Sequence, residues 1–206
     1  MDNMLSRRLA QGATLVVDDM LSAVQLEAYL AREGDQLEAG AWLSPDIQTH
    51  DDWCASLWAA NFERDRLLLS STQSDALWRR VVAASPAGAA LIDTARIATW
   101  ARQAWDLLHA WQLDFRELRA RDDDPGFRDF LEWAVQFEGA LRDSGWLDRG
   151  SLTRFVATNL GLDGDLPTNV VRADLRSETP ASKTLLDTLG RAGCEIETWA
   201  PAPVTR

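Results

Sequence analysis

Thr14-Leu15-Val16-Val17-Asp18-Asp19 is the stretch that decides the fold of this 206-residue chain. Its apolar, β-branched run predicts a short buried strand. Residues 20–33 follow as a predicted helix that Gly34 ends, with apolar residues at helical spacing: Leu21, Val24, Ala28 and Ala31. A strand followed at once by a helix is the first half of an α/β unit. The chemistry of such units sits at the carboxyl end of the strand.

The end of the chain has the pattern of a strand–helix–strand unit. Residues 169–173 and 194–199 predict two strands. Between them, Thr179-Pro180 is a cap followed by proline at the first helical position, which is a start signal for a helix. The leucines at 185, 186 and 189 give this helix its apolar face, and Gly193 ends it. Two strands joined in this way are expected to be parallel neighbours.

The region between these ends is predicted to be helical throughout, from about residue 51 to 160. Its strongest apolar stripe runs from Ile97 to Trp111. Residues 46–49 have the pattern of one further short strand. We therefore expect an α/β fold, with a small parallel sheet built from both ends of the chain and a large helical insertion. In domain terms, residues 1–50 and 161–206 would form an α/β lobe and residues 51–160 a helical lobe.

Ten tryptophans are many for a chain of this length. Five fall on predicted helical faces and are expected in the core: Trp53, Trp78, Trp105, Trp111 and Trp133. Trp42 and Trp146 lie beside predicted loops, where stacking on a base or a peptide is an alternative to packing.

The composition restricts the class of function. The net charge of -11 repels a phosphate backbone, so DNA binding would need a local basic patch. Any mechanism that needs a lysine has a single candidate, Lys183. The two cysteines, Cys54 and Cys194, form no pair motif and predict buried thiols rather than metal ligands. No long apolar run or leader pattern is present, so we expect a cytoplasmic protein with no membrane contact.

The opening strand with Asp18-Asp19 resembles the start of a response-regulator receiver, whose paired acids hold Mg²⁺ beside a phosphorylated aspartate. That chemistry also needs an aspartate at the end of a second buried strand, but the corresponding region, residues 51–54, predicts a helix. It further needs a lysine after a later strand, whereas Lys183 falls inside a predicted helix. The sequence therefore favours a simpler role for Asp18 and Asp19 as caps of the following helix.

A second resemblance covers most of the chain, in order. It is carried by five blocks: Gly12-Ala13-Thr14-Leu15-Val16-Val17; Trp42-Leu43-Ser44-Pro45-Asp46-Ile47 with Asp51-Asp52-Trp53; Leu68-Leu69-Ser70 through Ala76-Leu77-Trp78; Trp105-Asp106-Leu107-Leu108-His109-Ala110-Trp111; and Leu185-Leu186-Asp187-Thr188-Leu189 with Ala192-Gly193-Cys194-Glu195. In this respect the chain resembles the N-terminal region of the AddB/RexB-like proteins. In the bacterial branch labelled probable DNA repair protein, this helicase-like region precedes a RecB-type nuclease domain.

The resemblance implies an ATPase-like lobe with a helical insertion, as in superfamily 1 helicases. The chain departs from the family in two places. The first strand normally runs into a Thr-Pro-Asn-Arg-like turn, which here is acidic at Asp18-Asp19. The later strand normally leads to a Gly-Phe-Asp-like stretch, which here reads Ala173-Asp174-Leu175. An acidic turn in place of a basic one predicts weakened contact with DNA.

Catalysis can be judged from the residues themselves. A phosphate-binding loop needs a glycine-rich turn, a lysine for the β- and γ-phosphates and a hydroxyl for Mg²⁺, and nothing after Val17 supplies them. RecB-type nuclease chemistry needs an acidic residue and a Glu/Asp-x-Lys, and no such spacing exists in this chain. We therefore expect no ATP hydrolysis, no nuclease activity, no catalytic residue and no cofactor.

Four residues are candidates for weak contact with nucleic acid. Thr49 and His50 lie where helicase-like folds leave the second strand, often near a DNA backbone; the alternative is that Thr49 or Asp51 caps a helix. Arg116 and Arg119 are the other two candidates; with Arg121 they give a small basic edge, which the acidic residues 122–124 largely cancel. His50 and His109 lie far apart without a clear third ligand, so we expect no metal site.

Three functions follow from these observations. The leading hypothesis is a non-catalytic, helicase-like N-terminal module of a DNA repair nuclease, a scaffold or weak binder of single-stranded DNA, partnered by a nuclease domain or helicase subunit. The alternative is an acidic protein-interaction module that never touches DNA. The third is a small enzyme that uses Asp18 and Asp19 with Mg²⁺.

Overall fold

The computed structural model describes residues 3–34, 45–62, 66–89, 93–114, 117–118, 124–161, 164–173 and 178–200. The chain divides into two compact units. The first, which we call the sheet unit, comprises residues 1–57, 160–178 and 186–206. The second, the helical unit, comprises residues 58–159 and 179–185.

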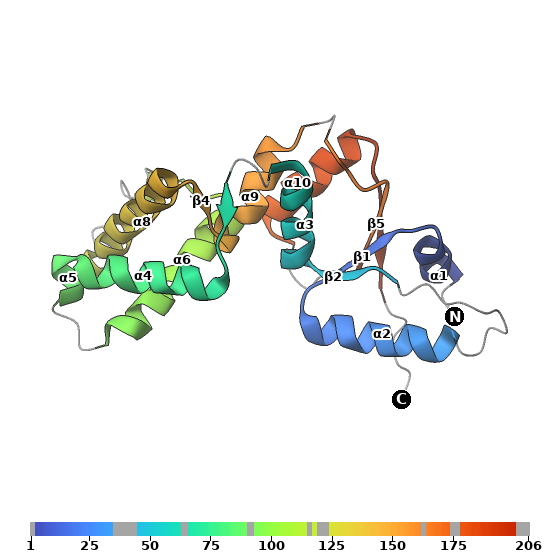
Figure 1. The fold of residues 1–206 in the computed structure, drawn as a ribbon, viewed down its shortest axis with the longest axis horizontal. Coiled ribbons are helices and arrows are strands. Elements are labelled where there is room, and N and C mark those ends of the chain that lie inside the picture. The colour runs from blue at the N-terminus through green and yellow to red at the C-terminus, as the bar shows by residue number, and fades with distance from the viewer. Residues whose placement is uncertain are drawn as a thin grey trace. The chain divides into compact units, whose positions relative to one another are not determined.

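The sheet unit is built on a four-stranded parallel sheet with the strand order β2-β1-β5-β6. Its strands are β1 (Thr14–Val17), β2 (Ile47–Thr49), β5 (Asn169–Ala173) and β6 (Glu195–Trp199). Strands from the two ends of the chain lie side by side, so that Leu15 pairs with both Ile47 and Val171 (Figure 1). The predicted α/β fold, with its parallel sheet from both chain ends and a helical middle region, is confirmed.

One face of this sheet is covered by α1 (Asn3–Ala10) and α2 (Met20–Gly34). Leu5 and Leu30 are buried there in one cluster with Leu15 and Val17 of the central strand. Alternation along the strand turns Val16 to the opposite face, where it is also buried. The chain crosses from β1 to β2 in one direction along the sheet, and from β5 through α10 (Pro180–Arg191) to β6 in the other direction. Right-handed crossovers that run in opposite directions place their helices on opposite faces, so α10 belongs to the face opposite α2.

The buried face of α2 differs from the expected one. The stripe that predicted the helix is largely exposed: Leu21 keeps 67% and Val24 53% of its surface in solvent. The helix instead packs through Ala23, Leu26 and Leu30, which share the opposite face at spacings of three and four. The sequence carries two apolar stripes on this helix, and periodicity alone cannot say which one meets the sheet.

The helical unit contains a bundle with two very short strands. α3 (His50–Phe62) leads into it from the sheet unit. The elements that follow are β3 (Leu67–Leu68), α4 (Ser71–Ala84), α5 (Pro86–Ala89), α6 (Thr94–Ala110), α8 (Pro125–Ser144), β4 (Trp146–Leu147) and α9 (Arg149–Asn159). The middle of the chain was predicted to be helical throughout, which is wrong at β3 and β4. These strands pair in parallel with each other. The pairing joins segments far apart in the sequence, and a two-residue strand is too short to have a recognisable sequence pattern.

Local signals set the ends of these helices. Ser70, Asp93 and Asp124 each accept a hydrogen bond from a backbone amide of the first turn of α4, α6 and α8. Gly145 ends α8 with a φ of 66°, a left-handed conformation that favours glycine.

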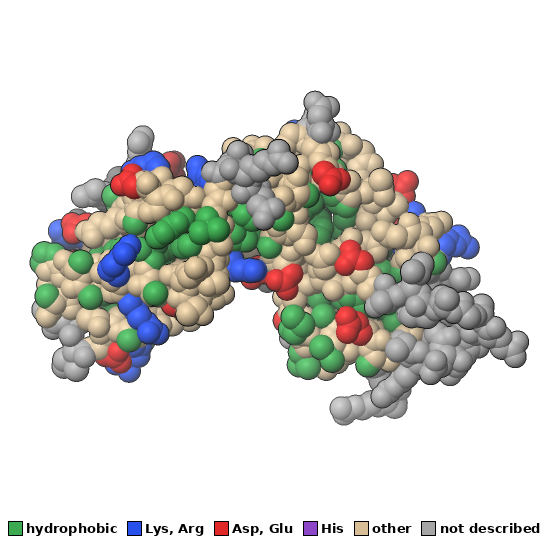
Figure 2. All heavy atoms as spheres, in the orientation of Figure 1, with side chains coloured by type: hydrophobic (Ala, Val, Ile, Leu, Met, Phe, Trp, Pro, Cys, Tyr) green, Lys and Arg blue, Asp and Glu red, His purple; other side chains and the backbone are tan. Residues whose placement is uncertain are grey.

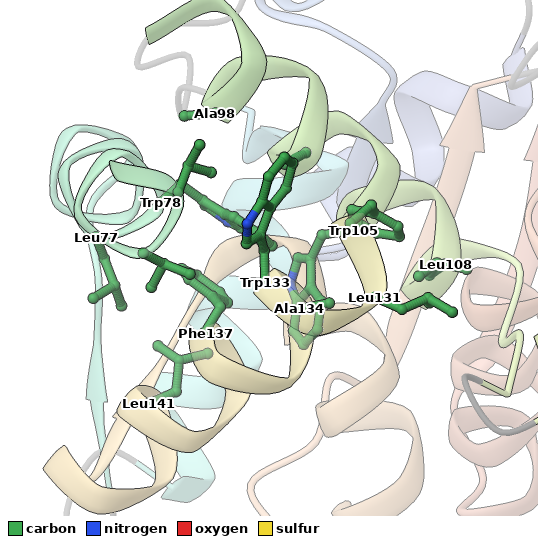
Figure 3. Close-up of a cluster of buried hydrophobic side chains, with 14 of the residues drawn as sticks. Leu77, Trp78, Ala98, Trp105, Leu108, Leu131, Trp133, Ala134, Phe137 and Leu141 are labelled. Carbon is green, nitrogen blue, oxygen red and sulfur yellow. The ribbon is translucent and has the colours of Figure 1, made fainter. Parts of the chain in front are cut away.

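Three aromatic rings form the centre of the bundle core (Figure 3). Trp78 of α4 stacks on Phe137 of α8 with ring centroids 4.2 Å apart, and Trp105 of α6 meets Phe137 edge-on at 5.3 Å. Trp53, Trp78, Trp105 and Trp133 are buried as expected. Trp111 is not: it follows the last residue of α6 and stays 52% exposed.

Trp42 and Trp146 were predicted to lie beside loops. Trp146 lies in β4 and packs, half-buried, against the bundle core. Trp42 lies outside the described residues.

Among the helices of the described part of the chain, none combines the length and apolarity that a bilayer crossing demands.

Candidate functional site

The carboxyl edge of the parallel sheet is the place where α/β folds bind ligands, at the point where the strand order reverses. In the sheet unit this point lies between β1 and β5, because the chain moves from β1 to β2 on one side and from β5 to β6 on the other. Asp18 and Asp19 follow β1, His50 follows β2, and Arg172 is the penultimate residue of β5. The topology therefore brings acidic, imidazole and guanidinium groups to one edge.

Asp19 serves as the cap of α2. Its carboxylate accepts a hydrogen bond from the Ser22 amide at 2.8 Å, and its carbonyl accepts one from Ala23 at 3.1 Å. A phosphate-binding loop would present the first amides of this helix to a phosphate. Here the Asp19 carboxylate already accepts the hydrogen bond of one of these amides, that of Ser22.

Thr49 is half-buried at the end of β2 and caps α3. Its hydroxyl donates to the Asp52 carboxylate at 2.8 Å and accepts from the Asp52 amide at 3.2 Å. Of the two interpretations of Thr49-His50, the structure therefore contains the helix cap. A phosphate contact at Thr49 would compete with this cap and with the negative charge of Asp52.

His50 occupies the first turn of α3 with its ring half-buried. Its Nε2 lies 3.5 Å from the Cys54 sulfur, and its ring centroid lies 6.0 Å from that of Trp53. Burial lowers the pKa of His50; Asp51 and Asp18 oppose this shift, while Arg172 adds to it. The imidazole is therefore largely neutral at pH 7 and contributes no positive charge to a phosphate site.

The Cys54–His50 pair has the residue types of a thiol nucleophile and its base. Its burial argues against that chemistry. Cys54 is completely inaccessible to solvent, so a substrate has no path to the sulfur. The pair is better explained as packing within one turn of α3.

Arg172 is the functional candidate that the sequence analysis missed. Its side chain is 13% exposed and forms an ion pair with Glu178 at 2.7 Å. The available signal was an arginine near the carboxyl end of an otherwise apolar strand. Because Glu178 neutralises it, the described part of this edge stays acidic through Asp18, Asp51 and Asp52.

The second predicted patch, Arg116 and Arg119, lies outside the described residues, so their contact with DNA stays a prediction. His109 lies in α6 of the helical unit, and burial lowers its pKa to about 4. Over the described segments, no three His, Cys, Asp or Glu side chains come together as a metal site would require.

What this arrangement can do chemically is limited. A capped helix start, a neutral imidazole and a neutralised arginine offer neither a phosphate cradle nor an accessible nucleophile. Searches against protein-family models and curated proteins find no match for this chain.

Proposed function

We propose that the chain is a non-catalytic, helicase-like module that contacts single-stranded DNA weakly and serves as a scaffold beside a nuclease domain or helicase subunit. The observation that carries this proposal is the topology. A parallel sheet built from both chain ends, with the bundle inserted between β2 and β5, is the arrangement that the resemblance to AddB/RexB-like proteins implies.

The acidic start of α2 supports the non-catalytic part of the proposal. In an ATPase lobe this turn would bind nucleotide phosphates through backbone amides and a lysine. Here the turn carries Asp18 and the capping carboxylate of Asp19 instead, and Lys183, the single lysine of the sequence, lies in α10.

Weak DNA binding follows from the charge. With a net charge of -11, the chain can approach a phosphate backbone only through local arginines, and each phosphate contact releases counterions. The proposed contacts at the sheet edge are Thr49 and His50, with Arg116 and Arg119 as a second patch. The cap made by Thr49 restricts the first of these to a marginal role.

The test is fluorescence anisotropy of the full chain with a labelled oligothymidylate, at low and at moderate salt. We expect binding at low salt that falls steeply as salt rises. Sub-micromolar affinity at physiological salt would contradict the electrostatic argument. No binding even at low salt would contradict the DNA-contact part of the proposal.

A second function is favoured by one specific observation. Met20, Leu21 and Val24 keep more than half of their surface exposed on one side of α2, and hydrophobic side chains gather over the start of this helix in Figure 2. Such a patch beside acidic residues fits an acidic protein-interaction module. The test is co-purification of the wild type and of the Leu21→Glu/Val24→Glu variant with a nuclease or helicase subunit of the kind proposed above. Loss of a complex that the wild type forms would support this function, and an unchanged complex would contradict it.

A further inference from the structure

A hollow of about 310 Å³ lies within the helical unit. Its volume is at the lower end of the range of small-ligand pockets. The walls come from α6, the end of α8, β4 and α9, with Arg66 preceding β3. The side chains that matter to the argument are Arg66, Arg142, Arg154, Glu138, Trp146 and Phe155.

The charge of this hollow is opposite to that of the chain. Among the described residues, three arginines line it, against one carboxylate, Glu138, in a molecule of net charge -11. Arg154 is half-buried, and the hydrogen bond it donates outside its own helix goes to the Leu113 carbonyl at 3.4 Å. Within the part of the chain that the structure describes, no carboxylate pairs with Arg66 or Arg154. Two cations that share a concave surface without acidic partners favour an anionic ligand.

The remaining walls are aromatic. Phe155 and Trp146 are half-buried, so each presents part of its ring to the hollow, and Trp105 lies deeper. The guanidinium of Arg66 lies over the Phe155 ring, 5.2 Å from its centroid. Arginine beside a flat aromatic surface is the combination that binds single-stranded nucleic acids, because the guanidinium contacts the phosphate and the ring stacks on a base.

A neighbouring hollow shows the contrast. It is lined mainly by apolar side chains of β3 and α4, with Arg80 as its one charged lining residue among those described. A ligand that carries both a phosphate and a ring matches the first hollow and not the second.

We propose that the hollow lined by Arg66, Arg142, Arg154, Trp146 and Phe155 binds one nucleotide of a single DNA strand, with the phosphate on the arginines and the base against the aromatic wall. The proposal rests on the proposed function, since it names the site through which the module contacts DNA. It moves the main contact from the sheet edge to the helical unit.

The test compares three variants of the full chain, Arg66→Gln, Arg154→Gln and Arg79→Gln, by anisotropy with a labelled oligothymidylate. Arg79 is an exposed arginine of α4 outside the hollow, so it is a control with the same change in charge. We expect Arg66→Gln and Arg154→Gln each to weaken binding about tenfold and to lower the salt slope by about one. Arg79→Gln should bind like the wild type. If Arg66→Gln and Arg154→Gln bind the oligonucleotide with the same affinity and salt slope as Arg79→Gln and the wild type, the proposal is overturned and the proposed function stands.

A second arm separates failure of the site from failure of the proposed function. Binding of thymidine monophosphate is followed by broadening of its proton resonances, in the wild type and in Arg154→Gln. If the wild type binds no oligothymidylate but binds the mononucleotide in an Arg154-dependent manner, the proposed DNA contact is wrong and the nucleotide site is supported. If it binds neither probe at low salt, both are overturned.

Discussion

At the residue scale, Asp148 of the helical unit is a buried carboxylate, 1% exposed, that directly precedes α9. It accepts hydrogen bonds from Trp105 Nε1 at 3.1 Å and from the Gly150 amide at 2.9 Å, and the Ser151 hydroxyl donates to it as well. Burial raises its pKa, while these donors oppose the shift. A buried carboxylate persists only because such donors replace water.

This arrangement predicts unequal costs for two similar substitutions. Trp105→Phe removes a donor to a buried carboxylate, which costs about 1.5–3 kcal/mol beyond the lost volume. Trp78→Phe removes a comparable volume, but among the described residues Trp78 Nε1 has no hydrogen-bond acceptor. Urea unfolding should therefore show Trp105→Phe to be the less stable variant. Equal stabilities would show that the indole–carboxylate bond adds nothing.

The two half-buried histidines predict a pH dependence of stability. The pKa of His109 is lowered from its ordinary 6.5 to about 4, first by burial and second by Arg154. Between pH 4 and pH 6.5 the unfolded chain binds a proton at His109 that the folded chain does not. The contribution of the neutral imidazole to the free energy of unfolding is therefore complete above pH 6.5 and is lost as the pH falls toward 4. His50, whose pKa burial also lowers, acts in the same direction.

The measurement is urea unfolding at pH 5 and at pH 7.5, for the wild type and His109→Phe. The wild type should lose on the order of 2 kcal/mol more than the variant on going to pH 5. Carboxylates that titrate in this range contribute to both proteins and cancel in the difference. Parallel losses in the two proteins would contradict the assignment to His109.

At the scale of the elements, α5 depends on one glycine. A Cβ placed on Gly88 would lie 1.8 Å from the carbonyl oxygen of Val82, which belongs to the backbone of α4 and cannot rotate away. The same corner is held by Ser85, whose hydroxyl oxygen accepts hydrogen bonds from Trp133 Nε1 at 2.7 Å and from the Gly88 amide at 2.9 Å. The contact between α4 and α5 therefore needs a residue without a side chain.

Gly88→Ala should consequently destabilise the chain by about 1–3 kcal/mol, although alanine is the better helix former. Gly139 supplies the matched control. It lies inside α8, and a Cβ there meets only the end of the Arg142 side chain, at 3.8 Å. Gly139→Ala should stabilise by about 0.5–1 kcal/mol. Thermal unfolding of both variants checks the signs, and a shift in the same direction for both would contradict the close approach at Gly88.

The elements also show how far the sequence can be read. The four strands of the sheet and the start of α10 at Thr179-Pro180 are found where local signals placed them, because each depends on residues that are neighbours in sequence. α1 was not predicted; it is attached to β6 by ion pairs from Arg8 to Glu195 and Glu197, a contact between opposite ends of the chain. The exposed stripe of α2 and the β3–β4 pairing likewise depend on partners distant in sequence.

At the scale of the whole molecule, the positions of the charges matter more for function than the net charge. The sequence gives the net charge of -11, and the structure shows where arginines gather. The arginines at 66, 142 and 154 carry no shared motif, since they come from three separate segments of the sequence. Their shared hollow exists because α8, β4 and α9 follow each other closely around α6. Thr49 and His50 were predicted as contacts from their position in a helicase-like fold. In the structure the Thr49 hydroxyl is engaged in the cap of α3, and burial lowers the pKa of His50.

The last prediction concerns ATP and belongs to the whole molecule, because hydrolysis needs a loop, a lysine and a metal-binding hydroxyl at one sheet edge. The described edge instead carries the Asp19 cap and the Arg172–Glu178 ion pair, both poorly suited to a triphosphate. We expect no phosphate release from ATP, with or without single-stranded DNA, and no micromolar affinity by calorimetry in the presence of Mg²⁺. Weak binding that Arg154→Gln removes and Mg²⁺ leaves unchanged would belong to the hollow of the helical unit. Phosphate release, or micromolar affinity that Mg²⁺ strengthens, would instead place a working nucleotide site on the sheet and contradict the non-catalytic module.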